Sequence, residues 1–178
     1  MTRGALLTLT CAITLGLGLS GCGGDDEKEP SATPASASAS STQDAAEAEV
    51  FAAYTAFLAE KKAIQNSGKV PADAYATTLA PVRIEKERAI AKDYAERGVV
   101  RVGQSEVRDP EVVDLTADSA TLLVCENEDG WGFKPNGGEP QFAKGGWRPR
   151  GMQVVQVDGR WLVAETIEQD RLTKDCGA

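Results

Sequence analysis

The side chains that most enzymes use for catalysis are poorly represented in this chain. Its 178 residues include no histidine, which excludes the common zinc sites and the Ser-His-Asp and Cys-His catalytic groups. Tyr54, Asp93 and Tyr94 are the residues that could move a proton beside a carbonyl group. Asp93 and Tyr94 are adjacent on an expected helix, so their side chains diverge by about 100 degrees. The residues therefore favour a non-catalytic protein, with no metal site and no cofactor.

The four cysteines are the other reactive side chains. Cys22 ends the sequence Leu-Ser-Gly-Cys, directly after a basic and then apolar start that has the form of an export signal. Cys11 lies inside that signal, which leaves Cys125 and Cys176 for the folded domain. Because exported proteins meet an oxidising environment, this pair predicts a disulfide that fastens the carboxyl-terminal tail to the sheet.

Residues 19–22 resemble the lipobox of bacterial lipoproteins. The resemblance implies that residues 1–21 are removed as a signal peptide and that Cys22 carries the lipid. Two acyl chains suffice for stable anchoring, so the expected location is the extracytoplasmic face of the cell membrane. A retained spanning helix is the weaker alternative, because Thr and Gly interrupt the apolar run. The composition, lipobox and cysteine pair together resemble secreted lipoproteins of high-GC Gram-positive bacteria.

The composition divides the rest of the chain into a spacer and one domain. Residues 22–43 are rich in Ser, Ala, Pro and acidic side chains, which is typical of a disordered tether. The folded domain is expected over residues 44–178. A net charge of -8 gives no support to a duplex-binding surface, so nucleic acid is not expected as a partner.

The sequence predicts a long amphipathic helix at the start of the domain. Residues 44–47 have the D-x-x-E form of a capping box, and residues 66–68 form a turn signal. Between them, one face is marked by residues spaced three and four apart. These are Val50, Tyr54, Phe57, Leu58, Lys61 and Ile64.

Two further helices are expected before the first strand. Pro71 is suited to open a short helix that runs to Leu79, and Pro81 to open another over residues 82–97. Gly98 is expected to end the last helix in the left-handed conformation.

From residue 99 the apolar pattern changes to period two, which indicates strands. They are expected near residues 99–107, 112–116, 119–126, 147–157 and 160–168. Asp158-Gly159 is a strong hairpin signal between the last two. It predicts the pairs Gln156–Trp161, Val155–Leu162 and Val154–Val163.

This order describes an α+β domain with three N-terminal helices packed on a curved antiparallel sheet of about five strands. Tyr54 and Phe57 in the long helix, the helix ending at Gly98 and the terminal hairpin resemble the nuclear transport factor 2-like fold. That resemblance implies a cone-shaped sheet around the helices, often with a cavity.

Two segments are candidates for a binding site. Residues 126–130 fail the spacing of a calcium loop, and an acidic, solvated strand end is favoured instead. The glycine-rich loop 130–146 carries aromatic residues that could cover a pocket or contact a ligand. Local packing of those aromatics is the alternative. The expected contact residues are Trp131, Trp147 and Trp161, with Tyr54 as a possible cavity wall.

The sequence as a whole predicts a membrane-anchored, non-catalytic lipoprotein. Its domain is expected to bind a small apolar ligand or an envelope protein partner. The competing hypothesis is an isomerase or cyclase that works through a buried carboxylate within reach of a tyrosine hydroxyl.

Overall fold

The computed structural model describes residues 37–177, with side chains from residue 42 onward. Cys22, the expected signal peptide and most of the expected tether lie outside the described residues. Over the described part the chain is an α+β domain with two α-helices and two antiparallel sheets of six strands in all. The expectation of three helices on one curved sheet of about five strands, a nuclear transport factor 2-like cone, is therefore wrong, although the α+β class is right.

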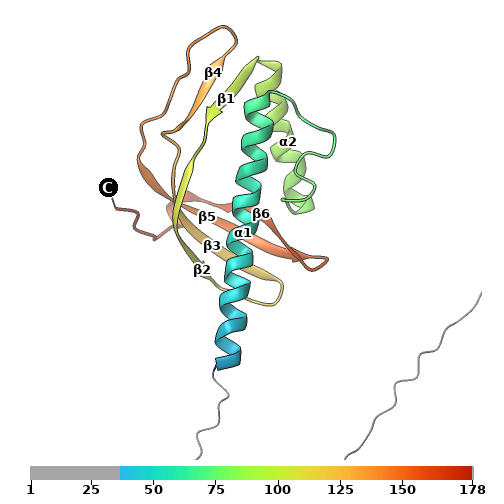
Figure 1. The fold of residues 1–178 in the computed structure, drawn as a ribbon, viewed down its shortest axis with the longest axis vertical. Coiled ribbons are helices and arrows are strands. Elements are labelled where there is room, and N and C mark those ends of the chain that lie inside the picture. The colour runs from blue at the N-terminus through green and yellow to red at the C-terminus, as the bar shows by residue number, and fades with distance from the viewer. Residues whose placement is uncertain (1–36, 178) are drawn as a thin grey trace, which may run out of the picture. The chain divides into compact units, whose positions relative to one another are not determined.

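Helix α1 spans Ala37–Ser67 and runs past both sheets (Figure 1). It begins before the expected capping box at residues 44–47, in a stretch of mostly serine and alanine. Its inward stripe follows the predicted spacing, with Val50, Tyr54, Phe57 and Ile64 buried. This stripe supplies one wall of the core.

The expected second helix at residues 71–79 is absent, and a series of turns takes its place. Tyr75 has a φ of 66°, a left-handed conformation that a right-handed helix does not allow. Glu60 of α1 holds the turns, since its two carboxylate oxygens accept hydrogen bonds from the Tyr75 backbone N–H at 2.7 Å and the Thr78 hydroxyl at 2.6 Å. A long-range contact thus overrides the local proline signal.

Helix α2 spans Pro81–Glu96, in agreement with the predicted third helix. Pro81 stands in the first turn, where its missing N–H costs nothing. Gly98 has a φ of 63° and ends the helix as expected. The buried residues of α2 are Glu87 and Ala91.

The larger sheet has the strand order β2-β3-β5-β6. Its strands are β2 (Glu106–Val113), β3 (Ser119–Asn127), β5 (Trp147–Val157) and β6 (Arg160–Ile167). The predicted hairpin register is confirmed: Gln156 pairs with Trp161, Val155 with Leu162 and Val154 with Val163. Asp158 and Gly159 both have positive φ, as the tight turn requires.

The smaller sheet is a ribbon of two strands, and the sequence patterns did not predict it as a separate sheet. The expected strand 99–107 breaks after Gly103, which has a φ of 80°, so β1 (Val99–Gly103) and β2 belong to different sheets. Strand β4 (Trp131–Pro135) lies inside the glycine-rich segment that was expected to be a loop, and it pairs with β1. In Figure 1 this ribbon lies above the larger sheet, and β1 begins next to the end of α2.

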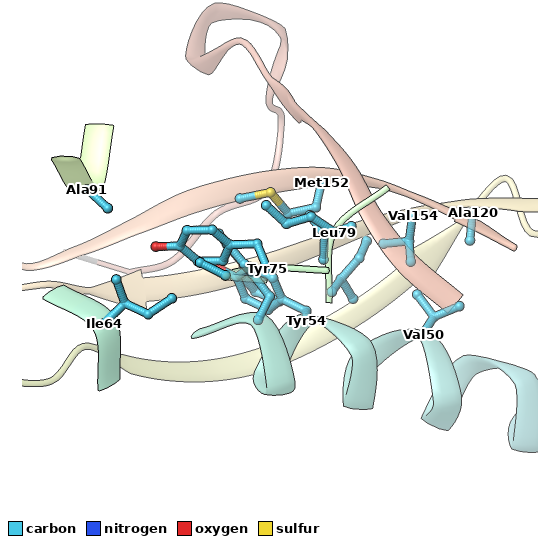
Figure 2. Packing of buried hydrophobic residues seen from close by; sticks show 14 residues of the cluster. Val50, Tyr54, Ile64, Tyr75, Leu79, Ala91, Ala120, Met152 and Val154 are labelled. Atoms are coloured by element: carbon cyan, nitrogen blue, oxygen red, sulfur yellow. The ribbon is translucent and has the colours of Figure 1, made fainter. Parts of the chain in front are cut away.

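The core lies between α1 and the inner face of the larger sheet (Figure 2). Alternate residues of β3, namely Ala120, Leu122 and Val124, face α1 and are almost fully buried. Met152 and Val154 of β5 join them. Side chains from α1, the turns and the sheet thus occupy this layer.

The carboxyl-terminal tail lies on the outer face of the larger sheet. Cys125 and Cys176 form the predicted disulfide, with Cα atoms 5.5 Å apart. The Arg108 guanidinium donates a hydrogen bond to the Cys176 carbonyl oxygen at 2.7 Å. Leu172 packs where a side chain at Gly151 would stand. The tail therefore covers residues of β3 and β5 that would otherwise face solvent.

None of the helices in residues 37–177 combines the length and the apolar character that crossing a membrane requires.

Candidate functional site

A buried tyrosine–glutamate pair lies between α1 and the end of β3. Tyr54 is fully buried and Glu126 is 6% exposed. The Tyr54 hydroxyl donates a hydrogen bond to Glu126 Oε2 at 3.4 Å. Burial, followed by the negative charge of Glu126, raises the pKa of Tyr54 well above its usual value. Tyr54 therefore stays protonated near neutral pH and acts as a hydrogen-bond donor rather than as a base.

Two arginines hold the carboxylates of this region. Arg150 reaches Glu126 Oε2 with Nε at 3.2 Å and Glu128 Oε2 with Nη2 at 3.0 Å. Arg101 of β1 approaches Glu128 Oε1 at 3.7 Å. The network therefore extends from Tyr54 in the core to the small ribbon. The acidic segment 126–130 is not wholly solvated, because Glu126 lies inside the domain.

The space beside Glu126 limits what the pair can do chemically. Glu126, Glu128, Arg150 and Gly145 help to line a hollow of about 40 Å³. Ligand pockets usually measure about 300–1,000 Å³, whereas a water molecule needs about 10–15 Å³ of such space. The hollow suits water and not a substrate of steroid size. Since Arg150 already engages Glu126, this geometry gives little support to proton transfer on a carbonyl substrate.

We expect Tyr54→Phe to destabilise the domain by about 1 kcal/mol, because it removes the donor to a buried carboxylate. Tyr75→Phe is the matched control: the Tyr75 hydroxyl is equally buried but has no hydrogen-bond partner. Its removal should leave the free energy of unfolding unchanged or raise it. Urea unfolding of both variants measures the difference. Equal losses in the two would contradict the assigned hydrogen bond.

Trp131 is not an exposed loop residue, since it begins β4 and is 2% exposed. The Arg101 guanidinium carbon lies 3.4 Å from the centroid of its indole ring, and 4.6 Å from that of Phe133. Arg101 Nη2 also donates to the Trp131 carbonyl oxygen at 2.9 Å. Trp131 Nε1 donates to Asn66 Oδ1 on α1 at 3.3 Å. Trp131 thus joins the ribbon to α1 as local packing.

The structure does not bring the three tryptophans together. Trp147 is the first residue of β5 and lies opposite Asn127 of β3. Trp161 lies in β6 opposite Gln156, near the other end of β5. Trp147 is half-buried under Arg108, whose guanidinium carbon lies 4.1 Å from the ring centroid. Trp161 packs against the core. No common contact surface of these residues exists in the described domain.

A different aromatic residue reaches the surface beside the ribbon. Phe142 is 51% exposed, and its ring occupies the place where a side chain at Gly132 would stand. Gly132 pairs with Val102, and Lys134 pairs with Val100. Because directly paired residues of an antiparallel ribbon share a face, Val100, Val102, Lys134 and Phe142 lie on the same side of it. We call these residues the Phe142 face.

The Phe142 face is apolar with a charged margin. Val100 and Val102 are half-buried, while Lys134 is exposed. Glu139 lines the same surface hollow as Val100 and Lys134. Gly132 is essential to this arrangement, since a Cβ there would lie 2.8 Å from the Phe142 ring. Sequence patterns missed the face because it depends on the pairing of β1 with β4.

In residues 37–177, no group of three or more Cys, Asp and Glu side chains is arranged to hold a metal ion. No protein-family model matches the chain, and no curated protein matches it.

Proposed function

We propose that the chain is a lipid-anchored, extracytoplasmic lipoprotein whose domain binds an envelope protein partner through the Phe142 face and carries out no catalysis. The proposed anchoring and extracytoplasmic location rest on residues 19–22 and on the disulfide between Cys125 and Cys176, which suits an oxidising compartment. The proposed binding role rests on one observation: the half-exposed Phe142 ring, which lies over Gly132 of β4.

A protein partner is favoured over a small apolar ligand because of how the interior is packed. The layer between α1 and the larger sheet is occupied by core side chains, including Tyr54, the residue proposed as a cavity wall. Aromatic residues, in contrast, are the typical anchors of protein interfaces when they stand at the surface. The exposed Lys134 on the Phe142 face suits a partner segment that carries an acidic side chain beside apolar ones.

We expect Phe142→Ala to weaken partner binding by about tenfold or more, since an interface anchor contributes 2 kcal/mol or more in typical cases. The free energy of unfolding of this variant should differ from that of the wild-type protein by less than about 0.5 kcal/mol, because the ring is at the surface. Val82→Ala is the matched control, as Val82 is 72% exposed in the first turn of α2, away from the ribbon. Retention of envelope proteins on the immobilised variants measures the effect.

The result against the proposal is equally clear. Equal retention by wild-type protein, Phe142→Ala and Val82→Ala would show that the Phe142 face is not the contact surface.

A further inference from the structure

The outer face of the larger sheet carries a hollow that the proposed function does not use. Two neighbouring rows of paired residues cross the four strands there. The first row is Glu111, Leu123, Gly151 and Ile167, and the second is Val113, Thr121, Gln153 and Glu165. All residues of the second row line a hollow of about 310 Å³, which lies within the size range of ligand sites. The hollow therefore extends across the strands.

The carboxyl-terminal tail lies over the first row and forms a wall of this hollow. Leu172 occupies the place where a side chain at Gly151 would stand, and Lys174 Nζ donates to Glu111 Oε2 at 3.0 Å. Leu172 and Thr173 line the hollow together with the second row. We call the hollow between the tail and the second row the tail groove.

The tail has the form of an extended strand without a partner strand. Leu172 has a φ of -93° and a ψ of 127°. Leu172, Lys174 and Cys176 are half-buried or buried, whereas Thr173 and Asp175 between them are exposed. Because alternate side chains face the sheet, the backbone N–H and C=O groups of the tail point sideways, along the surface of the sheet.

These backbone groups are unpaired where the tail borders the groove. The N–H and C=O groups of Thr173 and Lys174 take part in none of the hydrogen bonds of the described residues. Unpaired backbone groups along an extended segment are a template for pairing with another extended chain. The tail therefore offers a free strand edge above the sheet.

The charged side chains that line the tail groove also lack partners. They are Glu165 of β6, Asp114 directly after β2, and Arg171 of the tail. The ion pairs within residues 37–177 include none of the three. Two carboxylates and one guanidinium give the lining a net charge of -1, which suits a ligand that carries a basic side chain.

We propose that the tail groove binds an extended peptide segment of about four residues that carries a lysine or arginine. The peptide lies beside the tail as an added strand and exchanges backbone hydrogen bonds with Thr173, while its basic side chain meets Glu165. Three strand spacings of about 4.8 Å give the groove a length of roughly 14 Å, which four extended residues match. The site uses no residue of the Phe142 face.

A small apolar molecule suits the tail groove less well. Thr121 and Gln153 form the middle of its floor, and their polar side chains take part in no hydrogen bond of the described residues. An apolar ligand would cover these groups without satisfying them, which costs free energy. A peptide supplies polar groups to them and to the tail at the same time.

The test is an NMR titration of the ¹⁵N-labelled full chain in detergent micelles with the blocked peptide acetyl-Thr-Val-Lys-Val-amide. Its β-branched residues favour the extended conformation. We expect saturable shifts of the Thr173 and Gln153 amide resonances and none at Phe142. N-methylation of both valine amides blocks one edge of the peptide, and N-methylation of the threonine and lysine amides blocks the other. One of these two peptides should bind about fivefold more weakly than the other, because only one edge meets the tail.

Two pairs of variants locate the contacts on the protein. Thr173→Pro removes the backbone N–H and should weaken binding about fivefold, whereas Thr173→Ala should retain it. Leu172 already has the extended conformation that a following proline requires. Glu165→Gln should weaken binding about threefold. Glu168→Gln is its control, because Glu168 is exposed and does not line the tail groove.

Three outcomes overturn the proposal. Equal binding of the two N-methylated peptides, or of Thr173→Pro and Thr173→Ala, excludes pairing with the tail. Unchanged binding by Glu165→Gln excludes recognition of the basic side chain. Shifts of Thr173 that depend on protein concentration and not on millimolar peptide indicate that a second copy of the chain, and not a peptide, occupies the groove.

Discussion

Replacing Cys125 and Cys176 together by alanine should lower the free energy of unfolding by about 4 kcal/mol on the chain-entropy model. The two residues are 51 positions apart, so the bond closes a long loop and restricts the unfolded chain strongly. In the folded state the same bond holds the tail on β3. Urea unfolding of the oxidised wild-type protein and of the double variant measures the loss.

A matched control separates the disulfide from the other tail contacts. Lys174 pairs with the exposed Glu111 at 3.0 Å, and Lys174→Ala should cost no more than about 1 kcal/mol. The double cysteine variant should keep its far-ultraviolet circular dichroism spectrum. A loss no greater than that of Lys174→Ala, or labelling of both thiols in the unreduced native protein, would contradict the structural role of the bond.

Replacing Cys22 by serine should abolish membrane anchoring of the protein. Two acyl chains give stable anchoring, whereas a protein without them has no comparable affinity for the bilayer. We expect the wild-type protein to be recovered with the membrane fraction and Cys22→Ser to be released or to stay unprocessed. Intact mass of the detergent-extracted wild-type protein should exceed the chain that starts at Cys22 by a diacylglyceryl group, with or without an N-acyl chain. Wild-type protein that still carries residues 1–21 would refute the anchoring.

Features controlled by local physics were predictable from the sequence. The Asp158-Gly159 turn sets the register of β5 and β6 because both positions accept positive φ. Pro81 and Gly98 bracket α2 for similarly local reasons. The disulfide followed from the number of cysteines left in the domain, not from any geometry.

Features controlled by distant contacts were not predictable. The turns around Tyr75 depend on the Glu60 carboxylate of α1, which no local pattern in residues 71–79 reveals. Strand β4 depends on pairing with β1, and glycines in its segment favour turns locally. The stacking of Arg101 on Trp131, and the Phe142 face, follow from that pairing and could not be foreseen without it.

Glu126 is an intermediate case. Ala120, Leu122 and Val124 alternate along β3, and the same period places Glu126 on the inward face. The signal was in the sequence, but the run of acidic residues that follows Glu126 favoured a solvated strand end. Extending the strand period as far as Glu126 would have placed its side chain on the inward face.

The most direct test of the proposed function is photo-crosslinking in intact cells. A photoreactive amino acid is placed at position 142 in the anchored wild-type background, and at position 82 as the control. We predict one discrete adduct with an envelope protein from position 142, recovered in the membrane fraction and absent from position 82. No adduct at position 142, or the same adducts from both positions, would contradict binding through the Phe142 face.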